Sequence, residues 1–266
     1  MKNDLNLSQE LLLADDEPLA FEIVNASGIS NLVLVCDHAS KRVPRCLNNL
    51  GLTVEQLDDH IGWDLGAAEV ARILSKNLDA PLVLSGYSRL VIDCNRPLQS
   101  PQSIPEQSAG VFVPMNQNIT DAERARRIHN LFTPYHNAIN KLLDSRKNRA
   151  TIFLSIHSFT PVLNNQQRPW NIGISFWRDK RFAALLIKAL RESGDIVVGD
   201  NEPYAIEDAF DYAIPIHGEG RGLPSAMIEM RQDGIRTDTD VAKWAERITQ
   251  AYLHIENEVL KFALRQ

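Results

Sequence analysis

Two histidines and one glutamate each follow a run of strand-forming residues. Residues 33–36 lead into Asp37 and His38, residues 152–156 lead into His157, and residues 225–228 lead into Glu229. Short apolar runs rich in β-branched residues are typical of buried parallel strands. In open α/β sheets, reactive groups lie just beyond the carboxyl ends of such strands. If the three strands are parallel neighbours, two imidazoles and a carboxylate meet at one edge of the sheet, which predicts a metal site with a general base.

A third metal ligand is expected from Asp64. It begins a helix after the loop that follows His38, so its side chain can point back at the same edge of the sheet. Catalytic zinc commonly takes two histidines and a carboxylate and keeps one position open. Asp37 and Asp59 are competing carboxylates, and a helix N-cap is the alternative role for Asp64. Asp37 is better suited to hydrogen-bond a metal-bound imidazole. The predicted metal is zinc, although the same ligands accept iron, manganese or cobalt.

Glu229 alternates with apolar residues at 228 and 230, which places an acid in a core strand. Burying a carboxylate is costly unless it is paired or catalytic. One reading is an ion pair with Arg231. The other is a general base that takes a proton from the attacking water and returns it to the leaving nitrogen.

A polar stretch at residues 88–96 holds Arg89, Asn95 and Arg96. Guanidinium groups bind carboxylates through two parallel hydrogen bonds. These side chains are therefore candidates for holding an acidic substrate, and a solvated salt-bridge face is the alternative.

The elements that must position these residues alternate between strands and helices. Strands are expected at 20–24, 32–37, 81–85, 90–92, 151–159, 171–177, 196–199 and 225–231. Helices are expected around 9–13, over 65–78 and over 180–193. Capping boxes at 53–56 and 120–123 each begin a further helix, and the second of these is expected to run to about 149 with a kink near 134. A last helix is expected to begin at a cap at 238 or 239 and to end at about 264. This alternation predicts a three-layer α/β/α fold with a mostly parallel sheet, in one domain over residues 1–266. Residues 97–119 form a long irregular loop, which is typical of a lid or binding loop.

Composition excludes several classes of function. The chain has 266 residues, of which 44% are hydrophobic and 23% charged, as in ordinary globular proteins. A net charge of -6 argues against nucleic acid or an anionic membrane as the main partner. The 3 cysteines show no metal-binding spacing. The N-terminal residues have no long apolar core typical of a signal peptide or membrane helix, so a cytoplasmic location is expected.

Five segments, in order over residues 31–235, resemble the N-formylglutamate amidohydrolase family. They are Asp37-His38-Ala39-Ser40 with Val43-Pro44, His60-Ile61-Gly62-Trp63-Asp64-Leu65-Gly66-Ala67, Ser88-Arg89 through Asp93-Cys94-Asn95-Arg96-Pro97, Ser155-Ile156-His157-Ser158-Phe159, and Glu229-Met230-Arg231. The resemblance implies a zinc-carboxypeptidase-like fold, with a mixed sheet between helical layers and one zinc per chain.

The resemblance also implies roles for individual residues. The metal ligands would be His38, Asp64 and His157, and the base would be Glu229. Asn95 and Arg96, with Arg89, would bind substrate carboxylates, while Arg231 or His217 would polarise the scissile carbonyl.

The chain departs from family members that act on formylglutamate, which tend to have Pro-His-Ser-Gly where this chain has Asp37-His38-Ala39-Ser40. It therefore resembles a divergent member. Our hypothesis is a zinc amidohydrolase that cleaves a linear amide C–N bond in a small acidic N-acyl amino acid such as N-formyl-L-glutamate. The rival hypotheses are another zinc amidase or peptidase, acting on a peptide or cell-wall amide, and a non-catalytic binding protein. The oligomeric state is left open.

Overall fold

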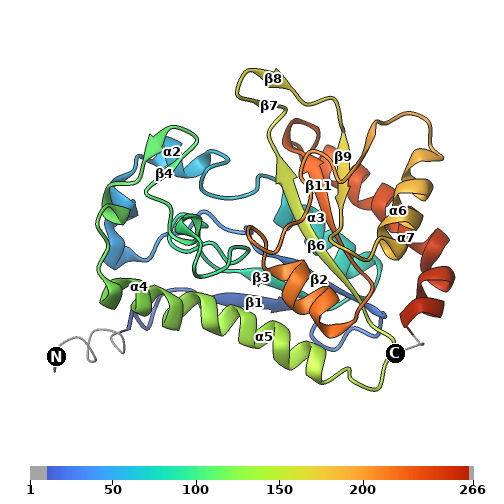
Figure 1. Ribbon diagram of the computed structural model, residues 1–266, viewed down its shortest axis with the longest axis horizontal. Helices are drawn as coiled ribbons and strands as arrows, with labels where there is room; N and C mark the ends of the chain where they lie inside the picture. The colour runs from blue at the N-terminus through green and yellow to red at the C-terminus, as the bar shows by residue number, and fades with distance from the viewer. Residues whose placement is uncertain (1–10, 264–266) are drawn as a thin grey trace.

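The fold is organised around a mixed sheet of seven strands (Figure 1), seen in a computed structural model that describes residues 11–263. The strand order is β1 (Phe21–Val24), β3 (Leu82–Ser85), β2 (Leu32–Cys36), β6 (Ile152–Phe159), β11 (Ser225–Arg231), β9 (Ile172–Ser175) and β10 (Val198–Asp200). The four central strands β3, β2, β6 and β11 are parallel to one another. β1 and β9 pair antiparallel at either side of them, and β10 is parallel to β9. The mostly parallel mixed sheet is therefore confirmed.

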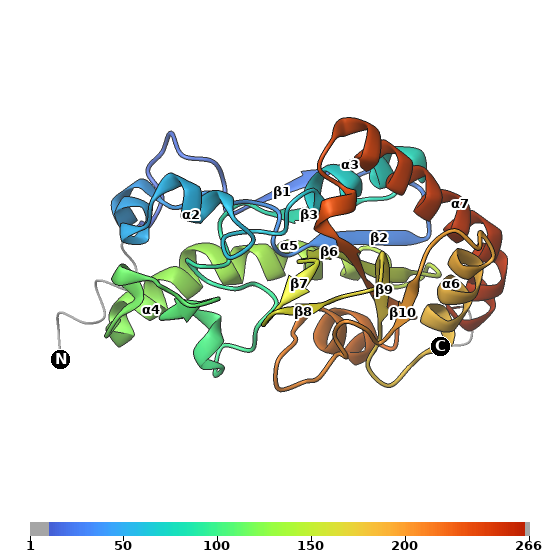
Figure 2. The same ribbon diagram turned by 90° about the horizontal axis from the view of Figure 1, so that it is seen from above.

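Helices cover both faces of this sheet (Figures 1 and 2). One face packs against α3 (Ala67–Asn77), α6 (Arg181–Arg191) and α7 (Asp238–Ala263). The other packs against α5 (Thr133–Asp144) and a π-helical turn at Ala213–Gly218. The alternation along β2 explains this division, since Leu32 and Leu34 belong to the first core, and Val33 and Val35 to the second. The expected three-layer α/β/α architecture is confirmed. In residues 11–263 no helix has the length and apolar character needed to cross a membrane.

The helix expected from Thr120 to about residue 149 is divided in two. α4 (Asp121–Arg127) is followed by a π-helical turn at Ile128–Phe132 and then by α5, which ends at Asp144. Thr133 N–H donates to the Ile128 carbonyl across five residues. Pro134 has no N–H and its ring crowds the preceding turn, so a wider turn before it accommodates the proline. The disturbance near 134 is confirmed, but the endpoint at 149 was wrong.

Other local predictions had mixed outcomes. The capping box at Thr53 is complete and begins α2 (Val54–Asp58). The strand expected at 90–92 was wrong, because these residues form a buried turn. Thr237, one residue before the predicted caps, accepts a hydrogen bond from the Asp240 backbone at 3.2 Å and caps α7. The helix expected at 9–13 lies partly outside the described residues, and residues 11–13 are not helical.

Residues 97–119 pack as a structured segment rather than a lid. They contain the hairpin β4 (Gln107–Ser108) and β5 (Val111–Phe112) and two short 3₁₀ turns at Pro101–Ser103 and Pro114–Asn116. Ile104 and Val113 are buried in a hydrophobic cluster separate from the two sheet cores. None of these residues, all of which the structure describes, lines the cavity discussed below. The expectation of a lid or binding loop here is therefore not supported.

Arg127 anchors this segment, and its replacement by leucine should be strongly destabilising. The guanidinium is buried, donates to Asn116 Oδ1 at 2.6 Å and to the Val91 carbonyl at 3.1 Å, and pairs with Glu123. Leucine would leave these buried acceptors without donors, which should lower the free energy of unfolding by about 2–4 kcal/mol. Urea denaturation measures this. The exposed Arg178, replaced by leucine in the same way, should change stability by less than about 0.5 kcal/mol; equal effects would contradict the assignment.

Candidate metal centre

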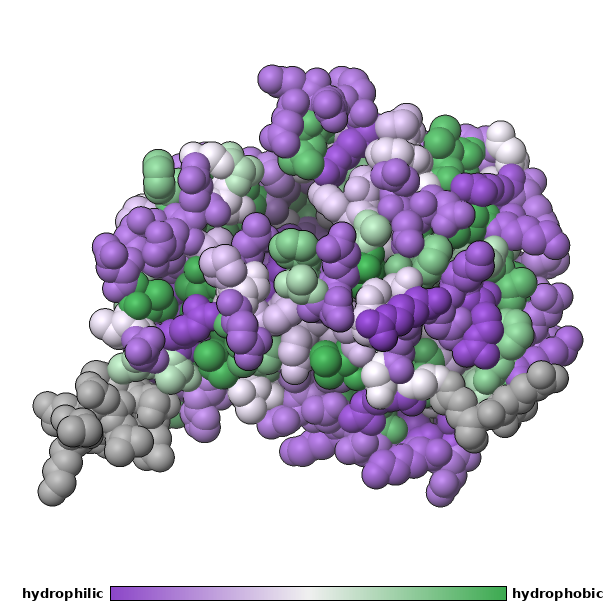
Figure 3. Space-filling model, in the orientation of Figure 1, coloured by the Kyte–Doolittle hydropathy of each residue, from purple (hydrophilic) through white to green (hydrophobic). Residues whose placement is uncertain are grey.

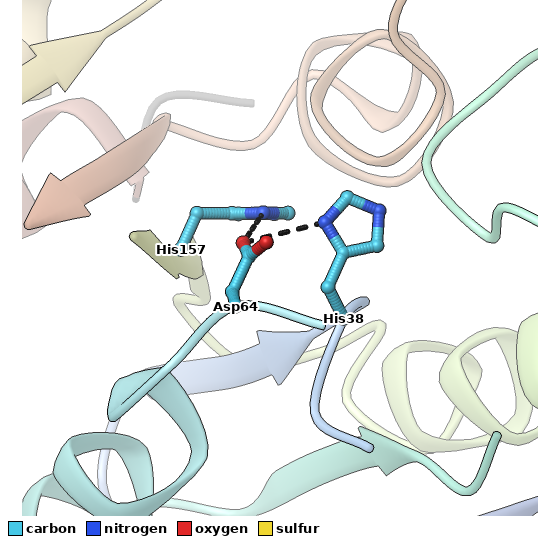
Figure 4. Close-up of side chains that lie close together, drawn as sticks. All are labelled: His38, Asp64 and His157. Atoms are coloured by element: carbon cyan, nitrogen blue, oxygen red, sulfur yellow. Dashed lines mark hydrogen bonds and ion pairs between the residues drawn. The ribbon is translucent and has the colours of Figure 1, made fainter. Parts of the chain in front are cut away.

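Three buried side chains converge near the carboxyl ends of β2 and β6 (Figure 4). His38 follows β2, His157 lies in β6, and Asp64 comes from the loop immediately before α3. One nitrogen or oxygen from each lies within 4.8 Å of the others. Asp64 Oδ2 is 3.3 Å from His38 Nδ1 and 2.9 Å from His157 Nδ1. The Nδ1 atoms of both rings and one carboxylate oxygen therefore face a common point, as a metal site requires.

The opposite nitrogens of both imidazoles are held by other carboxylates. His38 Nε2 lies 2.7 Å from Asp93 Oδ1, and His157 Nε2 lies 3.1 Å from Asp37 Oδ2. Such partners fix the ring orientation and keep the proton on Nε2, which leaves the Nδ1 lone pair for a cation. The expectation for Asp37 agrees with this geometry. The partner role of Asp93 was missed, although its place in the polar stretch at 88–96 was a signal.

Asp37 is itself firmly held at the base of the site. Besides His157, it accepts hydrogen bonds from the Tyr135 hydroxyl and the Ser155 hydroxyl, each at 2.9 Å. The hydrogen bond from His157 lowers its pKa to about 2, although burial alone would raise it. The carboxylate is therefore ionised at neutral pH and can orient the His157 ring.

The local backbone explains how Asp64 reaches the two histidines. Its N–H donates to the His38 carbonyl at 3.0 Å, which ties the loop to the end of β2. Gly66 is the N-cap of α3 at φ 77°, and a Cβ there would lie 2.5 Å from the Ile235 carbonyl. The left-handed glycine turns the chain into the helix directly after Asp64. The side chain of Asp64 bonds to the histidines, so the alternative role as an N-cap is not supported.

Glu229 stands beside the cluster, because it pairs in register with His157 across β11 and β6. Within residues 11–263, no group bonds to its buried Oε2. Burial raises the pKa of Glu229 to about 7, against the lowering effect of His157. The alternative of an ion pair with Arg231 does not occur, since Arg231 binds Asp233 at 2.8 Å instead. An unpaired buried carboxyl beside a metal cluster has the features of a general base.

Whether the cluster suits zinc can be tested by measuring the protons that zinc displaces from the histidines. Burial lowers the pKa of His157, but hydrogen bonds to Asp37 and Asp64 outweigh burial and raise it well above its usual value; the pKa of His38 is also raised. Metal-free protein at pH 7 should thus hold protons that zinc must displace. We expect zinc binding to release protons. The Kd for zinc should therefore decrease as pH rises, by up to about tenfold per pH unit for each displaced proton.

Calorimetry of zinc binding in two buffers with different ionisation enthalpies measures these protons. Equal heats in both buffers, with a Kd that is flat across the neutral range, would contradict the prediction.

A cavity of about 410 Å³ opens over the cluster. His38, Asp64, His157 and Glu229 line it, as do the predicted substrate-binding residues Arg89, Asn95 and Arg96. The hairpin of β7 (Val162–Leu163) and β8 (Gln166–Gln167) projects from the body beyond the end of β6, and it carries both apolar and polar residues (Figures 1 and 3). Seven of the nine site residues that were proposed from the sequence therefore line one cavity.

The other two proposed site residues lie elsewhere. Arg231 donates to Asp233 and to the Arg168 carbonyl, and it does not line the cavity. His217 is buried in the π-helical turn, where its Nε2 lies 2.8 Å from His136 Nδ1. Burial lowers the pKa of His217 to about 3. In the described structure neither residue is positioned to polarise a carbonyl in the cavity.

Sequence reasoning missed the loop that forms one wall of the cavity. Residues 203–211 contribute Tyr204, Ile206, Glu207 and Asp211, among others. Asn95 fastens this loop, since its Oδ1 accepts from the backbone of residues 212 and 213 at 3.1 and 2.9 Å. Asn95 therefore supports the loop rather than presenting a free amide. The only signal in the sequence was the interval between the strands expected at 196–199 and 225–231, for which no strand or helix was predicted.

Comparisons with known proteins show the family and the fold of this chain. The model of the N-formylglutamate amidohydrolase family matches residues 30–236, which is most of the chain. A crystal structure of a gene product from Agrobacterium tumefaciens is 35% identical, with a TM-score of 0.88, covering 92% of this chain and 99% of that one. A search of curated proteins found no match.

A crystal structure of N-formylglutamate amidohydrolase from Ralstonia eutropha has the same fold. It is 20% identical, with a TM-score of 0.62, covering 92% of this chain and 99% of that one. The matching family model supports an amidohydrolase. The chain belongs to the N-formylglutamate amidohydrolase family.

Proposed function

We propose that the protein is a zinc-dependent amidohydrolase that cleaves the linear amide C–N bond of a small acidic N-acyl amino acid, with N-formyl-L-glutamate as the reference substrate. One observation carries the proposal. Two histidine Nδ1 atoms and an Asp64 oxygen face one point, and the unpaired carboxyl of Glu229 is in register with His157. Two nitrogen ligands and one oxygen ligand suit zinc.

When bound, zinc would supply Lewis-acid chemistry to an oxygen that it contacts. His38, Asp64 and His157 would hold it. Glu229 would take a proton from the attacking water as the water oxygen adds to the amide carbon. The C–N bond then breaks, and Glu229 returns the proton to the leaving nitrogen, so that a carboxylic acid and an amine are released.

Arg89 is the best candidate for stabilising the negative charge on the carbonyl oxygen. Its Nη1 lies 3.4 Å from Asp64 Oδ1, next to the metal ligands, and its Nη2 lies 3.0 Å from Asp93 Oδ2. These carboxylates fix the guanidinium before substrate arrives, and a preorganised donor stabilises developing charge more effectively than a mobile one. Arg96, whose Nε lies 3.9 Å from the same Asp93 oxygen, would contact the amino acid part of the substrate.

The proposal is tested by hydrolysis of N-formyl-L-glutamate. Purified protein should release formate from it, activity should be lost after dialysis against a chelator, and stoichiometric zinc should restore activity. A panel of N-acetyl amino acids and a short peptide separates this function from that of a peptidase. Zinc binding without release of product from any of them would favour the rival hypothesis of a non-catalytic binding protein.

Two further parts of the proposal come from the sequence. We propose that residues 1–266 act as one domain, and that the protein works in the cytoplasm, where small amino acid derivatives are available. Fractionation of cells that express the protein tests the location.

A further inference from the structure

The charges around the cavity do not match a substrate with two carboxylates. Setting aside the metal-binding histidines, two cations and four carboxylates are among the described residues that line it. They are Arg89, Arg96, Asp64, Glu207, Asp211 and Glu229. A bound dication would offset part of the negative charge. A site that selects a dicarboxylate would instead be expected to present unpaired cations to both of its acids.

Both arginines already have carboxylate partners. Arg89 contacts Asp64 and Asp93 at 3.4 and 3.0 Å. Arg96 lies 3.6 Å from Asp211 Oδ1 and 3.9 Å from Asp93 Oδ2, and its side chain is 22% exposed. A second substrate carboxylate that approached Arg96 would therefore meet the negative charge of Asp211 at the same place.

Asp211 cannot easily turn away from Arg96, because two other groups hold its carboxylate. Its Oδ2 accepts from the Glu207 backbone N–H at 3.0 Å, and its Oδ1 accepts from Asn95 Nδ2 at 3.2 Å. Asn95 is buried and fixed by its own bonds to the backbone of residues 212 and 213. The carboxylate of Asp211, beside Arg96, is thus a fixed part of the cavity wall.

We propose that Asp211 determines specificity, by making the cavity prefer an N-acyl amino acid with one carboxylate and a neutral amide side chain over one with two carboxylates. A side-chain amide presents both an acceptor and a donor. Its carbonyl can accept from Arg96 while its NH₂ group donates to Asp211, so the Arg96–Asp211 pair is satisfied without a like-charge contact. This inference rests on the proposed function and narrows its substrate class.

The test compares N-formyl-L-glutamine with N-formyl-L-glutamate, which have the same shape and differ by one charge. For the zinc-loaded wild type, kcat/KM should be at least about tenfold higher for the glutamine derivative. Asp211→Asn should lower this ratio by about tenfold or more, chiefly by improving the glutamate derivative, because Arg96 becomes free to bind its second carboxylate. The ratio within one preparation is independent of how much of the variant is folded.

Asp208→Asn is the matched control. It removes the same charge from the same loop, but Asp208 is exposed, contacts Arg178 at 3.8 Å and does not line the cavity. Its ratio should equal that of the wild type. A ratio near one in the wild type, or a ratio unchanged by Asp211→Asn, would overturn the inference while the proposed function stood.

A binding measurement distinguishes failure of the proposed function from failure of the inference about Asp211. Calorimetry with zinc-loaded Glu229→Gln protein should show tighter binding of the glutamine derivative, and the added Asp211→Asn change should reverse or abolish this preference. If neither compound is hydrolysed by the wild type or bound by this variant, both the proposed function and the inference are overturned.

Discussion

Glu229→Gln should lower kcat for amide hydrolysis by about 10³-fold, within the range of about 10² to 10⁴ that general acid–base catalysis contributes. Glutamine keeps the size of the side chain but cannot take a proton from water. Because Glu229 is not one of the three clustered ligands, zinc content should remain near that of the wild type. Steady-state kinetics and metal analysis on the same preparation measure both quantities. Activity within tenfold of the wild type would remove Glu229 from the mechanism.

The same residue predicts the pH dependence of the wild type. Burial raises the pKa of Glu229 to about 7 in the metal-free protein. A base must be ionised to act, so kcat/KM should fall as pH decreases through this pKa. A bound dication favours the carboxylate and moves the midpoint below 7. The expected profile therefore rises from acid pH to a plateau near neutrality. A profile with no acid limb above the ordinary pKa of a glutamate would contradict this role.

His157→Ala should abolish stoichiometric zinc binding and, with it, activity. His157 offers Nδ1 to the cluster, 2.9 Å from Asp64 Oδ2, and its loss leaves one histidine and one carboxylate as ligands. Protein purified without chelator should contain one zinc per chain in the wild type and close to none in the variant. Metal analysis by mass spectrometry gives the stoichiometry, and circular dichroism verifies that the variant is folded.

A control variant and two intermediate variants show whether the loss of zinc is specific to the ligands. His254→Ala removes an exposed histidine whose ring lies 3.6 Å from Glu192, and it should leave zinc content unchanged. Asp37→Asn and Asp93→Asn keep all three ligands but weaken the hold on the rings, and they should reduce zinc affinity by roughly 10- to 100-fold. Full zinc occupancy in His157→Ala would mean that the strand-end histidines are structural, and the metal-dependent function would be withdrawn.

The parts of the site that depend on strand periodicity and sheet topology could be predicted from the residues alone. His38 and His157 follow apolar runs, and parallel strands place their carboxyl ends at one edge of a sheet. Because β2 and β6 are parallel neighbours, the two rings lie close together. Glu229 joined them for the same reason, through β11. The layer architecture followed from the alternation of strands and helices.

The pairing of polar groups across loops could not be predicted, because it depends on how segments that are distant along the chain fold together. Hydrogen bonds between Asp93 and His38, or between Asn95 and residues 212–213, join segments whose separation along the chain carries no periodic signal. The same is true of the wall formed by residues 203–211, since loop conformation is set by such contacts and not by propensity. Arg231 shows the limit of reasoning by proximity in sequence: it is two residues from Glu229, yet it bonds to Asp233 and to the Arg168 carbonyl. Charge pairing in three dimensions, and not residue type alone, decides which cations are free to bind a substrate.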